Sequence, residues 1–316
     1  MPGAGGTTAR PSPPLSAAES PPRKRALPVA LLLALRPKQW TKNLLLFAGL
    51  VFTANQRHPL SDVLLAVGAF AIFCLLSGCA YLLNDLQDVA ADRQHPKKRL
   101  RPIASGELPP GIAWLFFTLA TPLALLLAWR FIGLPFLLAA SLYFAITVAY
   151  SFRLKHIVLL DVLALASGFV LRAAAGALAI RVESSVWLLL CTLLLALFLG
   201  LTKRRSELVT LGDRPATRPI LAEYSLPMLD QMINIVASAC LMAYSLYTFN
   251  SPTGGKRHYL MATIPFVLYG LFRYLYLSHR RGMGEAPEQV LIEDRPLLIN
   301  LVLYIVTAVL AVRFGQ

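Results

Sequence analysis

Residues 60–92 read LSDVLLAVGAFAIFCLLSGCAYLLNDLQDVAAD, an apolar run that ends in a cluster of acidic and amide side chains. An α-helix rises about 1.5 Å per residue, so the apolar part, residues 61–83, is long enough to cross a bilayer core about 30 Å thick. The acidic part begins where that core ends. This stretch therefore predicts a membrane-spanning helix with polar chemistry at one boundary of the membrane.

The remainder of the chain has the same apolar character. Hydrophobic residues make up 57% of the 316 residues, charged residues only 15%, and the mean hydropathy is +0.61. Because lipid offers no partner to backbone N–H and C=O groups, we expect an all-α fold: a polytopic membrane bundle of about nine transmembrane helices around a cytoplasm-facing central cavity. The predicted spans lie near residues 43–55, 61–83, 111–129, 133–151, 157–180, 186–201, 227–248, 259–278 and 297–313.

The amino-terminal segment differs from the rest of the chain. Residues 1–26 are rich in Pro, Ser, Ala and Gly, and their basic end is Arg23, Lys24 and Arg25. A segment of this composition cannot bury enough apolar area to fold alone. We expect a disordered basic cytoplasmic tail over residues 1–26 and a transmembrane domain over residues 27–316.

The net charge of +14 would suggest nucleic-acid binding in a soluble domain. Here the basic residues lie between apolar runs, where they match anionic lipid headgroups, phosphorylated substrates and the excess of Lys and Arg in cytoplasmic loops. Their distribution over the predicted loops places the amino terminus and the polar clusters on the cytoplasmic side of the cell membrane, with the carboxyl terminus outside. We therefore expect membrane lipids as partners and no nucleic acid.

The acidic cluster at the end of the predicted helix is the strongest functional signal. At about 100° per residue, Asn84, Asp85, Asp88 and Asp92 fall on one face of an α-helix. Like charges on one face repel unless a divalent cation neutralises them, and Mg²⁺ prefers carboxylate oxygens and bridges to substrate phosphates. We predict Mg²⁺ as the cofactor, held by these four residues, with the three aspartates as catalytic residues. The alternative is a solvated helix end.

Three groups of basic and polar residues accompany the acidic cluster. Lys97, Lys98, Arg99 and Arg101 follow it directly, and they fit both phosphate binding and anchoring at the cytoplasmic face. The short loop after the fourth predicted span contributes Tyr150 and Lys155. At the end of the sixth predicted span, residues 203–205 are cations and Glu207 adds one carboxylate. The predicted substrate-binding residues are Lys38, Lys42, Asn84, Lys98, Arg99, Arg101, Tyr150, Lys155, Asp161, Lys203, Arg204 and Glu207.

Two charged residues fall inside the fifth predicted span. Asp161 and Arg172 lie three helical turns apart on nearly the same face. At about 16 Å along the helix axis they are too far apart to pair directly, so we expect a hydrated pocket between them. The alternative for Arg172 is that its side chain extends to the far interface. Before the last span, Glu285, Glu288 and the acidic residues 293–294 form either a solvated loop or part of the site.

Two of these stretches, NDLQDVAAD at residues 84–92 and YSFRLKHIVLLD at residues 150–161, resemble the UbiA-type prenyltransferase superfamily. The match extends over nearly the whole chain after the tail, and its NDxxDxxxD motif is specific. The resemblance implies an all-helical catalytic domain over residues 27–316 with a cytoplasmic central cavity. One departure matters: where other members carry a second Asp-rich motif, residues 203–207 read KRRSE, a cationic patch suited to a monophosphate.

Two further stretches, RPKQWTKN at residues 36–43 and GEAPEQVLIEDRPL at residues 284–297, resemble the decaprenyl-phosphate phosphoribosyltransferase branch of that superfamily. This resemblance implies Mg²⁺-dependent transfer of 5-phosphoribose from 5-phosphoribosyl 1-diphosphate to a polyprenyl phosphate, with release of diphosphate. It also implies a place in arabinosyl-lipid and cell-wall arabinan (arabinogalactan) biosynthesis.

Other functions stay open at this point. An aromatic prenyltransferase of the same superfamily, using a prenyl diphosphate, is the alternative enzyme. A transporter is the non-enzymatic alternative, and its signs would be inverted repeats or polar residues through the middle of the membrane. Here the polar groups collect at one surface. The sequence specifies neither the lipid length nor the oligomeric state, so a homo-oligomer is also open.

Overall fold

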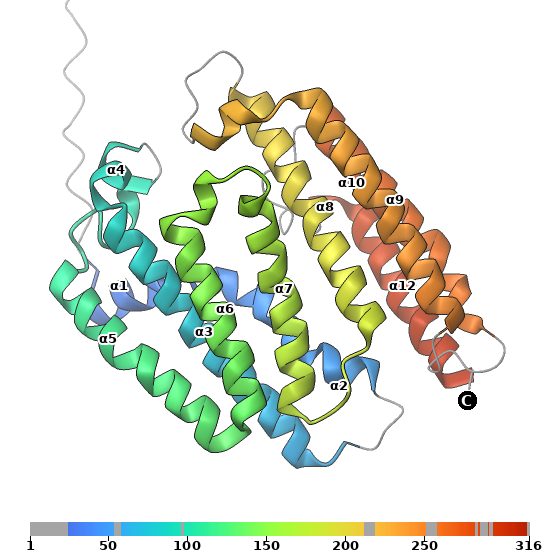
Figure 1. Ribbon diagram of the computed structural model, residues 1–316, viewed down its shortest axis with the longest axis horizontal. Helices are drawn as coiled ribbons and strands as arrows, with labels where there is room; N and C mark the ends of the chain where they lie inside the picture. The colour runs from blue at the N-terminus through green and yellow to red at the C-terminus, as the bar shows by residue number, and fades with distance from the viewer. Residues whose placement is uncertain are drawn as a thin grey trace, which may run out of the picture.

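The computed structural model is all helical over the residues that it describes (Figure 1), which confirms the predicted fold class. The described residues are 25–53, 58–95, 98–211, 219–250, 258–281, 284, 290 and 293–314. Nearly all of the predicted tail, together with Lys97, Glu285 and Glu288, lies outside them.

Within the described ranges, eight helical segments are long and apolar enough to cross a membrane. Large apolar side chains on their outer faces, such as Leu119, Leu142 and Val302, are exposed, as expected of surfaces that contact lipid. The eight segments are α3 (Leu60–Gln87), α5 (Pro110–Leu127) with η3 (Ala128–Ile132), α6 (Leu134–Phe152), α7 (Leu160–Ala179), α8 (Val186–Leu211), α9 (Leu226–Asn250), η7 (Tyr259–Thr263) with α10 (Ile264–Arg281), and α12 (Arg295–Phe314).

The predicted first span is not one long helix, so the count of nine is not confirmed. The chain here forms α1 (Leu27–Ala34), the 3₁₀ segment η1 (Pro37–Phe47) and the short α2 (Ala48–Phe52). Arg36 separates α1 from η1 with a left-handed backbone, φ 53°. A residue before proline is disfavoured in the right-handed helical region, which explains the break at this point.

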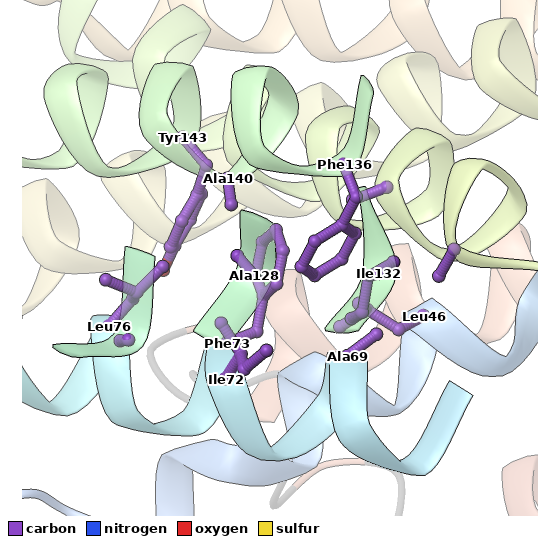
Figure 2. Close-up of a cluster of buried hydrophobic side chains, with 13 residues drawn as sticks. Leu46, Ala69, Ile72, Phe73, Leu76, Ala128, Ile132, Phe136, Ala140 and Tyr143 are labelled. Atoms are coloured by element: carbon purple, nitrogen blue, oxygen red, sulfur yellow. The ribbon is translucent and has the colours of Figure 1, made fainter. Parts of the chain in front are cut away.

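The first core cluster joins η1 to α3, η3, α6 and α7 (Figure 2). The Phe73 ring packs against Phe136 and Tyr143, with centroid distances of 5.7 Å and 5.0 Å. On α7, a Cβ at Gly176 would lie only 2.0 Å from the carbonyl oxygen of Leu46. The backbone of η1 therefore lies directly on α7, at a position that only glycine permits.

A second core cluster lies between α8, α9, α10 and the start of α12, where Phe198, Leu229 and Leu277 are fully buried. The bundle thus has two large packed halves, and a smaller cluster joins α1 to α3 and α5 within the first half. The short helix α4 (Val89–Gln94), the turn between α6 and α7, and the end of α8 all lie at the same end of the molecule, at the top of Figure 1. This end carries the polar clusters.

Candidate active site

The acidic motif spans the junction between α3 and α4. Asp88 leaves the helix, with φ −90° and ψ 8°, yet backbone hydrogen bonds from Asp88 N to Asn84 O (3.0 Å) and from Asp92 N to Asp88 O (2.8 Å) keep the four-residue spacing. The amide of Asn84 donates to Asp88 Oδ2 at 3.1 Å. The predicted single helical face is therefore bent at Asp88 but retains its spacing.

Two of the three aspartates are buried and contact arginines. Arg101 Nη1 lies 3.1 Å from Asp85 Oδ1 and 2.7 Å from Asp92 Oδ2, so one guanidinium bridges both carboxylates. Arg36 Nη2 donates to the same oxygen of Asp85 across 49 residues of sequence. Arg36 was not among the predicted site residues. Two signals in the sequence could have pointed to Arg36: it begins the RPKQWTKN stretch at residues 36–43, and it stands beside Pro37, where the apolar run of the amino-terminal segment ends.

Asp88 differs from the other two aspartates because solvent reaches a third of its side chain. Its Oδ1 lies 3.6 Å from Lys155 Nζ, on η4 (Leu154–His156) in the turn between α6 and α7. The acidic motif therefore meets the predicted polar loop after the fourth span at this point. Asp88 and Asn84 form the accessible edge of the motif.

The donor atoms of the motif suit Mg²⁺, which takes carboxylate and amide oxygens. Their present arrangement is less favourable, because the guanidiniums contact Asp85 and Asp92. Among the described residues, no three His, Cys, Asp or Glu side chains converge on one point that could hold a metal ion. The ligand chemistry fits, and cation binding would require these side chains to rearrange.

A buried ion pair between α7 and α8 forms the second polar cluster. Arg204 Nε donates to Asp161 Oδ2 at 2.7 Å, and Tyr224 OH donates to the other oxygen, Asp161 Oδ1, at 2.8 Å. The backbone N–H of Leu159 donates to the Tyr224 hydroxyl at 2.8 Å. Burial raises the pKa of Tyr224 to about 12, so its hydroxyl stays protonated at neutral pH and keeps donating. The substrate-binding roles of Asp161 and Arg204 stay predictions, and in the structure their charges neutralise each other.

The accessible edge of this pair is formed by Glu207 and Tyr150. Arg204 Nη1 donates to Glu207 Oε2 at 2.7 Å, and its Nη2 lies 3.4 Å from the Tyr150 hydroxyl. Tyr150 lies at the end of α6, just before Lys155. The predicted group at the end of the sixth span therefore adjoins the polar loop after the fourth span. The other predicted residues vary in exposure: Lys38 and Arg99 are exposed, whereas Lys42, Lys98 and Lys203 are half-buried.

Arg172 takes partners other than Asp161. Its Nε donates to Asn43 Oδ1 and its Nη2 to the Tyr143 hydroxyl, both at 2.7 Å, and its Nη1 donates to the Gly168 carbonyl at 2.9 Å. The side chain is buried, so the alternative in which it extends to the far interface is wrong. Arg172 instead attaches η1 to α6 and α7.

An apolar cavity of about 400 Å³ lies between α8, α9, α10 and α12 and also reaches Leu45 of η1. Along α8 it extends from Trp187 to Leu199, and the Phe198 carbonyl accepts a hydrogen bond from Thr202 at the start of the basic cluster. From the opposite side Leu301 and Tyr304 line it. The cavity therefore begins about one helical turn from the polar end of α8.

Residues 44–290 match the UbiA prenyltransferase family. The chain belongs to this family. Among the relatives of this UbiA family member, the decaprenyl-phosphate phosphoribosyltransferase of Mycolicibacterium smegmatis is 33% identical over 299 residues, which cover 90% of this chain and 93% of that protein. The protein of the same name from Corynebacterium glutamicum is 35% identical over 300 residues, covering 89% and 86%.

A solved structure of a UbiA homolog from Archaeoglobus fulgidus, bound to GPP and Mg²⁺, has a TM-score of 0.67 and 20% identity, covering 90% of this chain and 99% of that one. At this identity the likeness concerns the fold alone. Family and fold together confirm the resemblance that the motifs indicate. The UbiA family member is thus a multi-pass membrane protein and an enzyme of a prenyl-transferring class.

Proposed function

We propose that this UbiA family enzyme transfers 5-phosphoribose from 5-phosphoribosyl 1-diphosphate to a polyprenyl phosphate such as decaprenyl phosphate, with release of diphosphate. The observation that carries this proposal is the pairing of one acidic motif with a basic cluster on α8. Lys203, Arg204 and Arg205 occupy the place where a second acidic motif would hold more metal. Arg204 and Arg205 are paired with Asp161 and Asp230 in the structure. We therefore assign a substrate monophosphate to Lys203 at the same end of α8. The names of the two relatives point to the same reaction.

In this mechanism Asn84, Asp85, Asp88 and Asp92 of the acidic motif would hold Mg²⁺, which would supply positive charge for the leaving diphosphate. Lys155, beside Asp88, adds a cation on the accessible edge. An oxygen of the lipid phosphate forms the new bond to C1 of the ribose, while the C1–O bond to diphosphate breaks and its electron pair leaves with the diphosphate. The lipid phosphate is already anionic, so no general base is needed.

The apolar cavity between α8 and α12 is the place we assign to the polyprenyl chain. It is almost entirely apolar, and it starts close to Thr202 and the basic cluster. A lipid phosphate held near Lys203 would thus have its chain directed away from the acidic motif and along α8. Glu207, on the accessible edge of the Arg204 network, is the carboxylate available to a ribose hydroxyl.

The same proposal includes the location and the domain organisation. We place the acidic motif on the cytoplasmic side of the cell membrane, as the distribution of Lys and Arg favours. Residues 27–316 form the catalytic domain and residues 1–26 the tail. The product would feed arabinosyl-lipid and cell-wall arabinan synthesis.

A direct test uses purified protein in lipid nanodiscs with Mg²⁺. One reaction contains decaprenyl phosphate and 5-phosphoribosyl 1-diphosphate, and the other contains a prenyl diphosphate and an aromatic acceptor. We expect diphosphate release and a phosphoribosylated lipid only in the first reaction. Release only in the second would identify an aromatic prenyltransferase, and product in neither, with movement of substrate across sealed vesicles, would identify a transporter.

A further inference from the structure

Arg36 joins α1 to η1 in a backbone conformation that non-glycine residues seldom adopt, φ 53° and ψ 64°. Such a conformation persists where surrounding contacts hold it. Here the guanidinium donates to Asp85 Oδ1 and lies 4.7 Å from the centre of the Tyr81 ring. The side chain of Arg36 is therefore held at the acidic motif by a charge-assisted hydrogen bond and an aromatic face.

Arg36 and Arg101 together contact the carboxylates that a divalent cation would use. Both guanidiniums lie on Asp85 Oδ1, and Arg101 also bridges to Asp92. A cation bound to the same oxygen at about 2 Å would repel two positive groups in contact with that oxygen. Cation binding at Asp85 therefore requires at least one guanidinium to leave.

Arg36 is the guanidinium better placed to leave, because it has one carboxylate partner and Arg101 has two. The side chains of Arg36 and Arg101 are exposed to a similar extent, 26% and 24%, so the number of carboxylate partners decides between them. A guanidinium displaced from Asp85 stays close to the motif, because its backbone is fixed between α1 and η1. A diphosphate bridged to the new cation would be the nearest anion available to it.

We propose that Arg36 is a partner-exchanging residue of the active site: it neutralises Asp85 before the divalent cation binds and then transfers to the donor's diphosphate. The proposal rests on the proposed function in taking a diphosphate as the incoming anion. It assigns Arg36 opposite effects on two ligands. The residue competes with a cation that binds alone, and it assists a cation that binds together with diphosphate. A residue that merely supports the fold would affect both ligands in the same direction.

The test measures binding in Arg36→Gln with Mn²⁺ as a paramagnetic probe and inorganic diphosphate as the anion. Free Mn²⁺ is followed by electron paramagnetic resonance on full-length protein in nanodiscs. We expect Mn²⁺ alone to bind several-fold tighter than in the wild type, because Asp85 loses a competing charge. We expect the affinity for diphosphate in the presence of Mn²⁺ to fall about tenfold, because one charge-assisted hydrogen bond is lost.

The matched control is Arg273→Gln in the other half of the bundle. Arg273 also pairs with a buried carboxylate, Asp294, and lies 5.4 Å from the centre of the Tyr276 ring. Neither affinity should change in this control. Shifts of the same sign for both ligands in Arg36→Gln, no shift in either, or equal shifts in the control would each overturn the exchange.

Arg36→Lys covers the case in which the glutamine variant does not fold. It keeps the charge without the planar fork, so both shifts should keep their sign at smaller size. Both affinities equal to the wild type in every foldable variant would overturn the proposal. Because the assay uses neither the sugar donor nor the polyprenyl phosphate acceptor, its result stands even if 5-phosphoribosyl 1-diphosphate proves not to be the donor. Conversely, phosphoribosyl transfer with unchanged affinities would reject the exchange alone.

Discussion

Two carboxylate–guanidinium clusters lie at the same end of the bundle and differ in how far solvent reaches the guanidinium. At the acidic motif, Arg36 and Arg101 have side chains 26% and 24% exposed, around a buried Asp85. Between α7 and α8, Arg204 is 2% exposed and Asp161 is fully buried. A partly exposed guanidinium can change partners at low cost, whereas a buried one cannot leave its carboxylate without stranding a charge. The first cluster is thus suited to ligand exchange and the second to fixed support.

The largest expected effect breaks the buried pair. Asp161→Ala leaves the charge of Arg204 buried with only Glu207 beside it, and we expect a loss of about 3–5 kcal/mol in the free energy of unfolding. Chemical unfolding in detergent measures this. The double variant Asp161→Leu with Arg204→Met should recover most of the loss, since it removes both charges of the buried pair together. A loss below about 1 kcal/mol in the single variant would show that the pair is not a fixed support.

The next effect concerns activity at the exchangeable cluster. Asp88→Asn removes the most accessible carboxylate and should lower the rate of diphosphate release about a hundredfold, roughly 2.7 kcal/mol in barrier height. The thermal unfolding temperature should change little, because solvent reaches this side chain. Asp62→Asn, at the opposite end of α3, is the control and should keep wild-type activity. Near-wild-type turnover in Asp88→Asn would refute the catalytic role of the motif.

A smaller effect tests the hydrogen bond from Tyr224 to Asp161. Tyr224→Phe should lower the free energy of unfolding by about 1–2 kcal/mol, since Asp161 Oδ1 and the Leu159 N–H lose a partner. The native pKa of about 12 lies above the ordinary value of 10.0. The stabilisation by the hydroxyl is therefore complete below pH 10 and declines as the pH approaches 12. Unfolding curves from pH 7 to 11 should show a constant difference up to about pH 10. A difference that declines already below pH 9 would contradict this assignment.

The smallest expected effect is on stability at the exchangeable cluster. Arg36→Gln should lower the free energy of unfolding by about 1 kcal/mol or less, because its side chain is partly solvated and Arg101 still neutralises Asp85. The same unfolding assay gives this value beside that of Asp161→Ala. If the two variants lose equal stability, the distinction between exchangeable and fixed clusters fails.

Much of the fold could be predicted from the sequence because lipid leaves so few choices. Long apolar runs must be helical, so the predicted ranges of α3 and of most later spans agree with the structure to within a few residues. The exception is α8, which continues to Leu211 although the predicted span ends at residue 201. The amino-terminal segment could not be placed as well. Its apolar residues are interrupted by Arg36 and Pro37, and a hydropathy window averages over such a break.

The contacts within the site were harder to predict, for a physical reason. The acidic motif is local, so helical spacing brings Asn84 to Asp88 without knowledge of the fold. The arginine partners of Asp85 are 49 and 16 residues away, and the arginine partner of Asp161 is 43 residues away. Nothing in a local pattern says which cation reaches which carboxylate. The catalytic role of the aspartates, their Mg²⁺ and the substrate contacts of the lysines stay predictions for the assays above.

The contact between Gly176 and the Leu46 carbonyl has a mechanical consequence. With no room for even one methyl group, α7 sets how deeply the amino-terminal segment can sit in the bundle. Gly176→Ala would push the backbone at Leu46 away from α7, and η1 connects Leu46 to residue 36. The absence of a side chain at Gly176 thus permits the close packing of η1 on α7, and η1 begins directly after Arg36.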